Sequence, residues 1–361
     1  MTGQTLLRAA DESAALEELH RLGCTDGLPV IVPTPERVDR MVLASGLAAD
    51  DVLGVMGPLM GAATVEKVAT AAVMAGCLPD HLPVVVAAVG AVCQPEFDLR
   101  EMQATTHCTA PLLIVNGPAR HECGGIASGF GALGPGHRAN ASIGRALRLA
   151  MINIGGARPG ESDMALHGHP GKFTFCFAED EEGSPFAPLH TSLGYHAEQS
   201  VVTVVGTEAP HSVFFSGDAD NAEASAEELL GLLAATVAAP GTNNVVLGGR
   251  GAVVVVLNPE HAAHLAAAGY DRAGIQQRLA ELAVVPIETA RRLHPRSFAG
   301  FSGSEVKAIR NPEQVLVVHA GGTGLYSMVM PTWATGPHAN RAVHTVIDLD
   351  QACELPWAAK P

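Results

Sequence analysis

Apolar positions along this chain follow two periods, and stretches of the two kinds alternate. Short apolar runs closed by a polar or glycine turn predict buried strands, as in "APLLIVNG" at 110–117. Longer stretches with apolar residues three or four positions apart predict helices, as in "GPGHRANASIGRALRLAMINIGG" at 134–156. The same criteria predict strands within 172–179, 200–208, 243–258 and 314–322, and helices within 221–238, 259–269 and 272–282. The stretch 78–93 fits a helix or a strand equally well, because its length and periodicity do not separate the two.

Turn and capping residues set several of the boundaries. An amphipathic helix is expected over 6–22, before Gly23, and another over about 64–75. Thr34 and Asn258 are good N-caps, and each is followed by a proline, which suits the first helical position.

The alternation of strands and helices predicts an α/β fold with mixed sheets and flanking helices. The repeated strand–turn–helix units also suggest an internally duplicated α/β unit. We expect an N-terminal helix (1–22), a first α/β domain (23–160) and a second (161–361), or one intertwined domain. Ligands of open α/β sheets bind at the carboxyl ends of strands, so the polar turns after these strands are the first places to look for chemistry.

Composition narrows the class of protein. The 361 residues carry a net charge of −15, which disfavours nucleic acid or an anionic membrane as the main partner. The first residues lack a signal-peptide pattern, and the apolar runs are too short to span a bilayer. Seven scattered cysteines without a CxxC pair argue against a disulfide framework. We therefore expect a cytoplasmic protein, with a homodimer as the default assembly.

Three histidines, two cysteines and a glutamate fall within 107–137, around the predicted strand at 110–117. The helix that follows the glycine-rich loop would present its positive end, and its first turns carry polar side chains that suit a small anion. No Walker lysine and no dinucleotide fingerprint is present, so no nucleotide cofactor is expected. The predicted residues are Arg138, Asn140 and Ser142 for the substrate anion, with His107 and His121 as catalytic candidates.

The stretch "ALHGHPGKFTFCFAEDEEGSPFAPLH" at 165–190 is the candidate metal site. His167 and His169 would lie on one side of an extended segment, Glu179 ends a predicted strand and His190 closes the loop. This ligand set suits Zn, Fe or Mn. The alternative makes His167 or His169 a general base oriented by Asp163 or Glu179, with Lys172 holding an anionic substrate.

Two other segments complete the candidate site. Cys123 follows a strand and precedes two glycines, which is the setting of a nucleophile whose pKa a nearby histidine could lower. The late stretch "HAGGTGLYSMVMPTW" brings Tyr326, a further candidate for substrate binding, close after a strand end. The basic stretch "LHPRSFAGFSGSEVKAIRNPEQ" is better suited to a surface or subunit contact than to catalysis.

Several stretches together, at 25–38, 105–120, 168–190 and 259–281, resemble a widespread bacterial family that accompanies UGSC-motif proteins. The latter are similar to the selenoprotein subunit of glycine reductases. The resemblance covers roughly residues 22–335. It implies small-molecule chemistry, cleavage of a carbon–heteroatom bond and a redox or UGSC-type partner protein, and it transfers no catalytic residue to this chain.

Taken together, these observations predict an enzyme of the lyase or hydrolase type that acts on a small anionic metabolite. Its histidines either bind a divalent metal (Zn, Fe or Mn) or act as acid–base residues without one. Two alternatives stay open. One is a non-catalytic metal- or ligand-binding subunit of a larger reductase or lyase complex, and the other is a cysteine-dependent redox enzyme.

Overall fold

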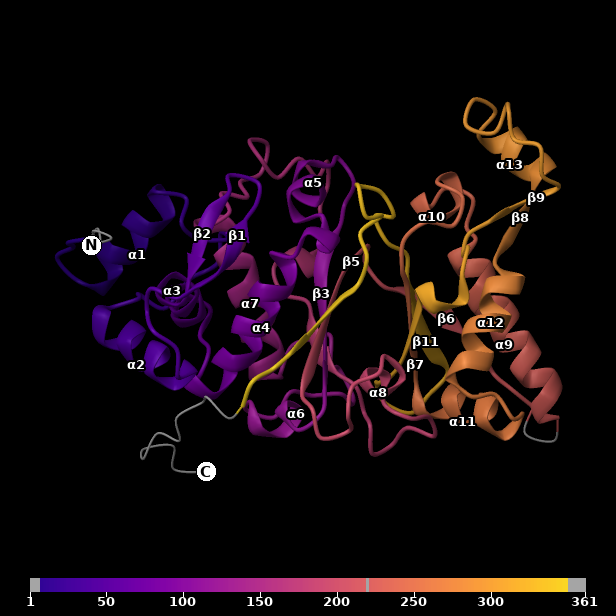
Figure 1. Cartoon of the computed structure of the whole chain (residues 1–361), viewed down its shortest axis with the longest axis horizontal. Helices are drawn as coiled ribbons and strands as arrows, with labels where there is room; N and C mark the ends of the chain where they lie inside the picture. The colour runs from indigo at the N-terminus through magenta and orange to yellow at the C-terminus, as the bar shows by residue number, and fades with distance from the viewer. Residues whose placement is uncertain (1–6, 219–220, 350–361) are drawn as a thin grey trace.

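The computed structural model describes residues 7–218 and 221–349. The described residues form an elongated molecule in which two four-stranded sheets stand side by side at the centre and helices cover the outer side of each (Figure 1). The fold is α/β, as predicted.

The first sheet has the strand order β12-β5-β3-β4. Its central strand β3 (Ala110–Asn116) pairs in parallel with β4 (Cys176–Ala178) and antiparallel with β5 (Val201–Thr207). The last strand, β12 (Val343–Val346), pairs antiparallel with β5 at the edge. The expected domain boundary at 160/161 falls inside this sheet, between β3 and β4.

The second sheet repeats this pattern with the order β10-β7-β11-β6. Here β7 (Val253–Leu257) pairs in parallel with β10 (Val315–His319) and antiparallel with β11 (Tyr326–Met330), which pairs antiparallel with β6 (His211–Phe214). The two sheets therefore share one strand plan, a regularity that fits the expected duplication. β12 is the last strand in the described chain, yet it belongs to the first sheet. The chain therefore returns to the first sheet after it has formed the second.

Side chains of the central strands alternate between two apolar cores. On β3, Leu113 and Val115 face a core shared with helices, whereas Leu112 and Ile114 face the other sheet. On β7, Val253 and Val255 likewise face helices, and Val254 and Val256 face the first sheet. The result is a helix–sheet–sheet–helix sandwich. Burial on both faces explains why these strands read as continuous apolar runs.

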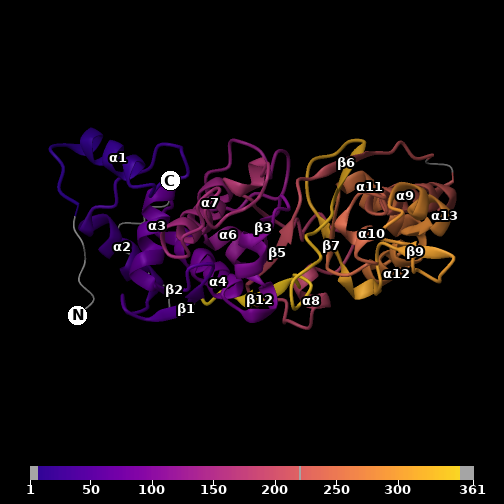
Figure 2. The same cartoon turned by 90° about the horizontal axis from the view of Figure 1, so that it is seen from above.

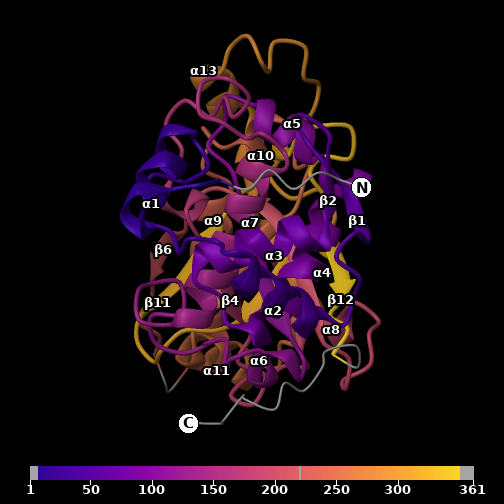
Figure 3. The same cartoon turned by 90° about the vertical axis from the view of Figure 1, so that its left-hand side faces the viewer.

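Two groups of helices form the outer layers. Seen along the long axis, the helices of the first group lie in front of the first sheet (Figure 3). This group comprises α1 (Glu12–Arg21), α2 (Pro35–Ser45), α3 (Val65–Ala75), α4 (Leu82–Val92), α5 (Leu99–Ala104), α6 (Ala119–Glu122) and α7 (Arg138–Asn153). The second group, at the opposite end of the molecule (Figure 2), comprises α9 (Ala222–Val237), α10 (Asn243–Val246), α11 (Pro259–Ala267), α12 (Arg272–Leu282) and α13 (Ile287–Leu293). Between them, α8 (Leu189–Ser192) precedes β5.

Two small antiparallel sheets of two strands and four short 3₁₀ turns complete the described elements. The sheets are β1 (Val52–Met56) with β2 (Gly61–Thr64), and β8 (Val284–Pro286) with β9 (Glu305–Lys307). The 3₁₀ turns are Pro79–His81, Pro95–Phe97, Pro170–Lys172 and Pro312–Gln314.

Several predicted boundaries shift for local reasons. Of the helix expected over 6–22, residue 6 lies outside the described residues and the described helix begins at Glu12, because the Asp11 carboxylate accepts a hydrogen bond from the Ala14 N–H and caps it. Thr34 and Asn258 cap their helices as expected. The ambiguous stretch at 78–93 is helical, and the strand expected over 172–179 shortens to β4 because a 3₁₀ turn occupies its start.

No single helix of the described ranges is long and apolar enough to cross a membrane. The pair Pro79–Val92 and Pro95–Ala104, bent by 77°, passes the same test of length and composition.

Candidate functional site

A cleft of about 780 Å³ opens beside the first sheet, at the amino-terminal end of β3. One wall is α7 and the other is the irregular segment 157–173, while the turn at 23–26 forms part of the rim. The cleft is large enough for a small-molecule ligand. The sequence predicts a site at the carboxyl ends of the strands. The cleft lies at the opposite end of β3.

The rim turn is held on α7 by a buried ion pair. The Arg145 guanidinium donates from Nε to Asp26 Oδ2 at 2.8 Å and from Nη2 to Asp26 Oδ1 at 2.9 Å. The Asp26 side chain is 3% exposed. Arg158, from the opposite wall, donates to the carbonyl oxygens of Leu22 and Gly23. The start of the sequence "TDGLPV" thus forms part of the cleft rim.

The inner wall carries one carboxylate between two cations. Asp163 accepts a hydrogen bond on Oδ2 from Arg148 Nη2 at 2.7 Å and on Oδ1 from Lys172 Nζ at 3.0 Å. All three side chains are 14% exposed or less. Burial raises the pKa of Asp163, but Lys172 and Arg148 outweigh it and the pKa lies below its ordinary value. Burial also lowers the pKa of Lys172; Asp163 opposes this shift and Arg148 adds to it.

The region on the other side of Arg148 and Lys172 is polar and incompletely hydrogen-bonded. Gln103, Thr109, Arg148 and Lys172 line a small cavity of about 10 Å³, roughly the space of one water molecule. Gln103 Nε2 and Thr109 Oγ1 are buried, and neither has a partner among the described residues. Buried polar atoms are normally satisfied, so these two offer hydrogen bonds to a ligand or to water.

The three histidines near the cleft differ in how many hydrogen bonds their ring nitrogens form. His169 accepts from the Gly171 N–H on Nδ1, and its Nε2 lies 3.2 Å from the Thr207 carbonyl oxygen. Both ring nitrogens are thus occupied, and burial lowers the pKa of His169, so it is held as a neutral ring. His107 Nε2 is paired with Glu208 Oε1 at 2.9 Å. His167 is exposed at the cleft lining, and no hydrogen bond joins its side chain to another described residue.

Of the catalytic candidates, Lys172 lines the cleft and His107 lies next to it. His121 points elsewhere: its side chain is 68% exposed and faces Glu182. Cys123 is 1% exposed, and burial raises the pKa of its thiol to about 12. A thiol held protonated in this way is a poor nucleophile, so burial disfavours the predicted activation of Cys123.

The predicted anion site at the start of α7 does not form. Asn140 uses its amide to hold the glycine-rich loop, bonding the backbone of Ala127 and Ala132. Arg138 and Ser142 both donate to the Gly76 carbonyl oxygen. Tyr326 lies in the second sheet, 59% exposed against Phe214. Arg138, Asn140 and Ser142 thus bond to the backbone of neighbouring segments, and Tyr326 lies in the other sheet. The four side chains do not converge on a ligand.

The four predicted metal ligands fall into two separate places. His167 and His169 line the cleft, whereas Glu179 and His190 lie at the carboxyl ends of the strands. Those ends are about 20 Å away, the length of the seven-residue strand β3. Within residues 7–218 and 221–349, no group of three His, Cys, Asp or Glu side chains is arranged to hold a metal ion. The four predicted ligands therefore do not converge on one site, and a divalent metal stays a prediction.

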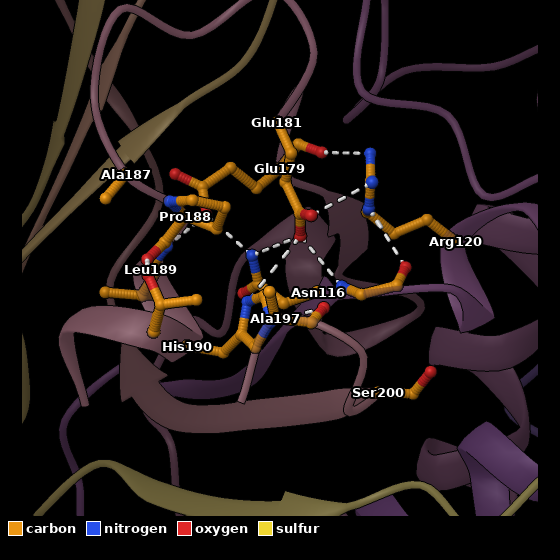
Figure 4. Close-up of polar contacts among 12 residues, drawn as sticks. Asn116, Arg120, Glu179, Glu181, Ala187, Pro188, Leu189, His190, Ala197 and Ser200 are labelled. Atoms are coloured by element: carbon orange, nitrogen blue, oxygen red, sulfur yellow. Dashed lines mark hydrogen bonds and ion pairs between the residues drawn. The ribbon is translucent and has the colours of Figure 1, made fainter. Parts of the chain in front are cut away.

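Glu179 is instead the centre of a buried cluster that joins the two sheets (Figure 4). Its carboxylate accepts hydrogen bonds from Asn116 Nδ2 at 2.6 Å, the Leu189 N–H at 2.7 Å and Arg272 Nη2 at 2.8 Å. Asn116 ends β3, Glu179 follows β4, and Arg272 begins α12 on the second sheet. The Glu179 side chain is fully buried and Arg272 is 6% exposed. This pair ties one half of the molecule to the other.

Reasoning from sequence missed Arg148, Gln103, Thr109 and Arg272. Arg148 and Arg145 lie three positions apart on the predicted helix, which places them on one face, and this spacing was the available signal. Gln103, Thr109 and Arg272 carry no comparable local pattern.

No protein-family model, no curated protein and no solved structure matches this chain. The resemblance drawn from its sequence stays a prediction.

Proposed function

We propose that the cleft binds a small anionic metabolite and that Lys172 exchanges a proton with it during cleavage of a carbon–heteroatom bond. The observation that carries this proposal is the buried Arg148–Asp163–Lys172 triad on the inner wall of the 780 Å³ cleft. Titratable groups with shifted pKa values that line a cleft are the usual mark of a reactive site.

Charge supports an anionic ligand. At the inner wall Arg148 balances the carboxylate of Asp163, and Lys172 adds one positive charge there when its amine is protonated. Arg158 and the exposed Glu161 also line the cleft, and no acidic side chain among the described residues lies within ion-pair distance of Arg158. A carboxylate or phosphate between these groups would be held by charge-assisted hydrogen bonds. The free donor of Gln103 faces the small neighbouring cavity, which has room for about one water molecule.

The reaction class that these groups favour is elimination. Neutral Lys172 would remove the proton from the carbon next to the substrate carboxylate, and the C–H electron pair would form the new double bond. The heteroatom on the neighbouring carbon would leave with its bonding electrons. His167, at the exposed side of the cleft, would protonate it when the leaving group requires an acid. The lowered pKa of Lys172 favours this role, because it increases the neutral fraction of the amine near neutral pH.

The test is binding followed by turnover. A panel of carboxylates and phosphorylated acids bearing β-hydroxy, β-amino or β-thio groups would be screened by calorimetry, and each binder would be assayed for elimination. Lys172→Met is expected to abolish turnover, and Lys172→Arg to retain binding without turnover, because arginine keeps the charge but does not act as a base.

Two control variants accompany the panel. Lys67→Met removes an exposed lysine outside the cleft and is expected to leave binding and turnover intact. Cys123→Ala is expected to keep full turnover, since its thiol is buried and protonated. Turnover that survives in Lys172→Met, or that disappears in Cys123→Ala, would overturn the proposal. Binding without turnover of any compound would favour a ligand-binding subunit instead.

A further inference from the structure

The segment 287–310 forms a basic arm on an acidic protein. It holds five of the 22 Lys and Arg residues but only two of the 37 acidic residues, so its net charge is +3 and the remainder of the chain carries −18. The arm consists of α13, the loop after it and β9, which pairs with β8 at its base. Figure 1 shows α13, β8 and β9 projecting beyond the second sheet and its helices.

Three cations of the arm are unpaired. Arg292, Arg296 and Lys307 are exposed, and no acidic side chain of the described residues lies within ion-pair distance of them. The other two basic residues are engaged: Arg291 donates to the Phe301 carbonyl oxygen, and Arg310 to that of Gly248. The arm therefore presents positive charge that its own chain does not neutralise.

The arm also presents apolar surface between these charges. Leu293 is 47% exposed and Phe301 is 37% exposed, while Phe298 is buried and packs edge-on against Phe301. Apolar side chains ringed by charge are the usual composition of an interface, with an apolar centre and a charged rim. The buried Phe298 gives the arm a fixed shape.

We propose that this basic arm docks on the acidic body of a second copy of the chain. A contact between two arms would set like charges against each other, so each arm must meet the body of its partner. Reciprocal docking of this kind closes a two-fold dimer, the commonest symmetry of soluble oligomers. The charge difference between the arm and the body would guide the encounter and make it sensitive to salt. This inference is independent of the proposed reaction.

Sedimentation velocity and light scattering at 50 mM and 500 mM NaCl test the assembly. The wild-type chain is expected to be a dimer at 50 mM and to dissociate at least partly at 500 mM. The variant Arg292→Glu/Arg296→Glu/Lys307→Glu is expected to be a monomer at both concentrations. The control Arg8→Glu/Lys67→Glu/Arg341→Glu makes the same change in net charge on exposed residues outside the arm, and is expected to remain a dimer. Circular dichroism would verify that both variants are folded.

Zero-length carboxylate–amine cross-linking of mixed ¹⁴N and ¹⁵N protein locates the contact. The chain has only four lysines, so cross-links from Lys307 are easily assigned. A mixed-isotope link from Lys307 to an acidic residue outside 287–310 is expected. A monomeric wild type at 50 mM NaCl, or a dimer that survives the arm substitutions, would overturn the proposal.

Discussion

At the scale of single residues, the buried polar side chains gather at the two ends of β3. Ten buried side-chain nitrogen and oxygen atoms of the described residues lack a partner. Five belong to the Glu179 cluster, on Asn116, His190, Arg272 and His319, and four belong to Gln103, His107, Thr109 and Thr207 at the cleft end. The strand interior between them is apolar. The unsatisfied polar atoms of the first sheet are therefore concentrated in these two places, whereas the buried Thr203 of β5 is satisfied by a hydrogen bond with His344 of β12.

The Glu179–Arg272 pair is predicted to be a large contributor to stability. Glu179→Gln removes the charge but keeps the shape, and leaves the buried guanidinium of Arg272 without its counter-ion. Breaking a buried pair in this way costs about 3–5 kcal/mol of unfolding free energy. Urea denaturation measures the change. Glu12→Gln is the control, because Glu12 and its partner Arg37 are 67% and 44% exposed and exposed pairs contribute about 1 kcal/mol or less. Equal effects of the two substitutions would contradict the role of Glu179 as a clamp.

Local patterns identified some of these residues and not others. Lys172, His167 and Glu179 stood out in the sequence because polar residues are dense between 163 and 190. That density could not show that the segment divides between the two ends of β3. Asn140 and Ser142 lie where an anion could bind at the start of a helix. Their side chains instead donate hydrogen bonds to the backbone carbonyl groups of Ala132, in the glycine-rich loop, and of Gly76. The local sequence does not show which distant groups will form hydrogen bonds with a given side chain.

At the scale of elements, the strands were predictable and their order was not. The apolar runs of β3, β5, β7 and β10 reflect burial between a helical layer and a second sheet. The pairing of β12 with β5 joins residues about 140 positions apart, and no periodicity encodes it. The cleft depends on a similar long-range contact, in which the turn at 23–29 is fixed to α7 by Asp26 and Arg145.

Loosening that contact is predicted to weaken binding. Asp26→Asn keeps the size of the side chain but removes the ion pair with Arg145, so the rim turn loses its anchor. The dissociation constant of a ligand found in the panel should rise about tenfold, which corresponds to about 1.4 kcal/mol. Calorimetry measures the effect, with Asp39→Asn as a control on an exposed residue of α2. An unchanged dissociation constant in Asp26→Asn would show that the turn does not shape the site.

At the scale of the whole molecule, the structure is two similar sheets packed face to face. Buried histidines make this packing sensitive to acid. Burial lowers the pKa of His81 to about 4, and the pKa of His344 to the same value. His81 accepts the Leu78 N–H on Nδ1, a contact that protonation would remove.

The stability of the protein is therefore predicted to fall as the pH drops. In the unfolded chain these histidines bind a proton near pH 6.5, whereas in the folded protein they stay neutral down to about pH 4. The unfolded state thus binds more protons in this window, and unfolding free energy is lost from about pH 6.5 to pH 4, on the order of 3 kcal/mol for His81. Urea titrations at pH 7, 6, 5 and 4 measure the slope. The variant His81→Gln should show a shallower slope, and an unchanged slope would contradict this assignment.

The most direct test of the cleft is the titration of Lys172 itself. Lysine labelled with ¹³C at Cε gives four NMR signals in a chain with four lysines, and Lys172→Arg assigns the relevant one. We predict that the Lys172 signal titrates below the ordinary lysine value of 10.5 and that it shifts when an anion from the panel binds. A signal that titrates at or above that value, and that no anion moves, would contradict the account of the cleft as an acid–base site for an anionic substrate.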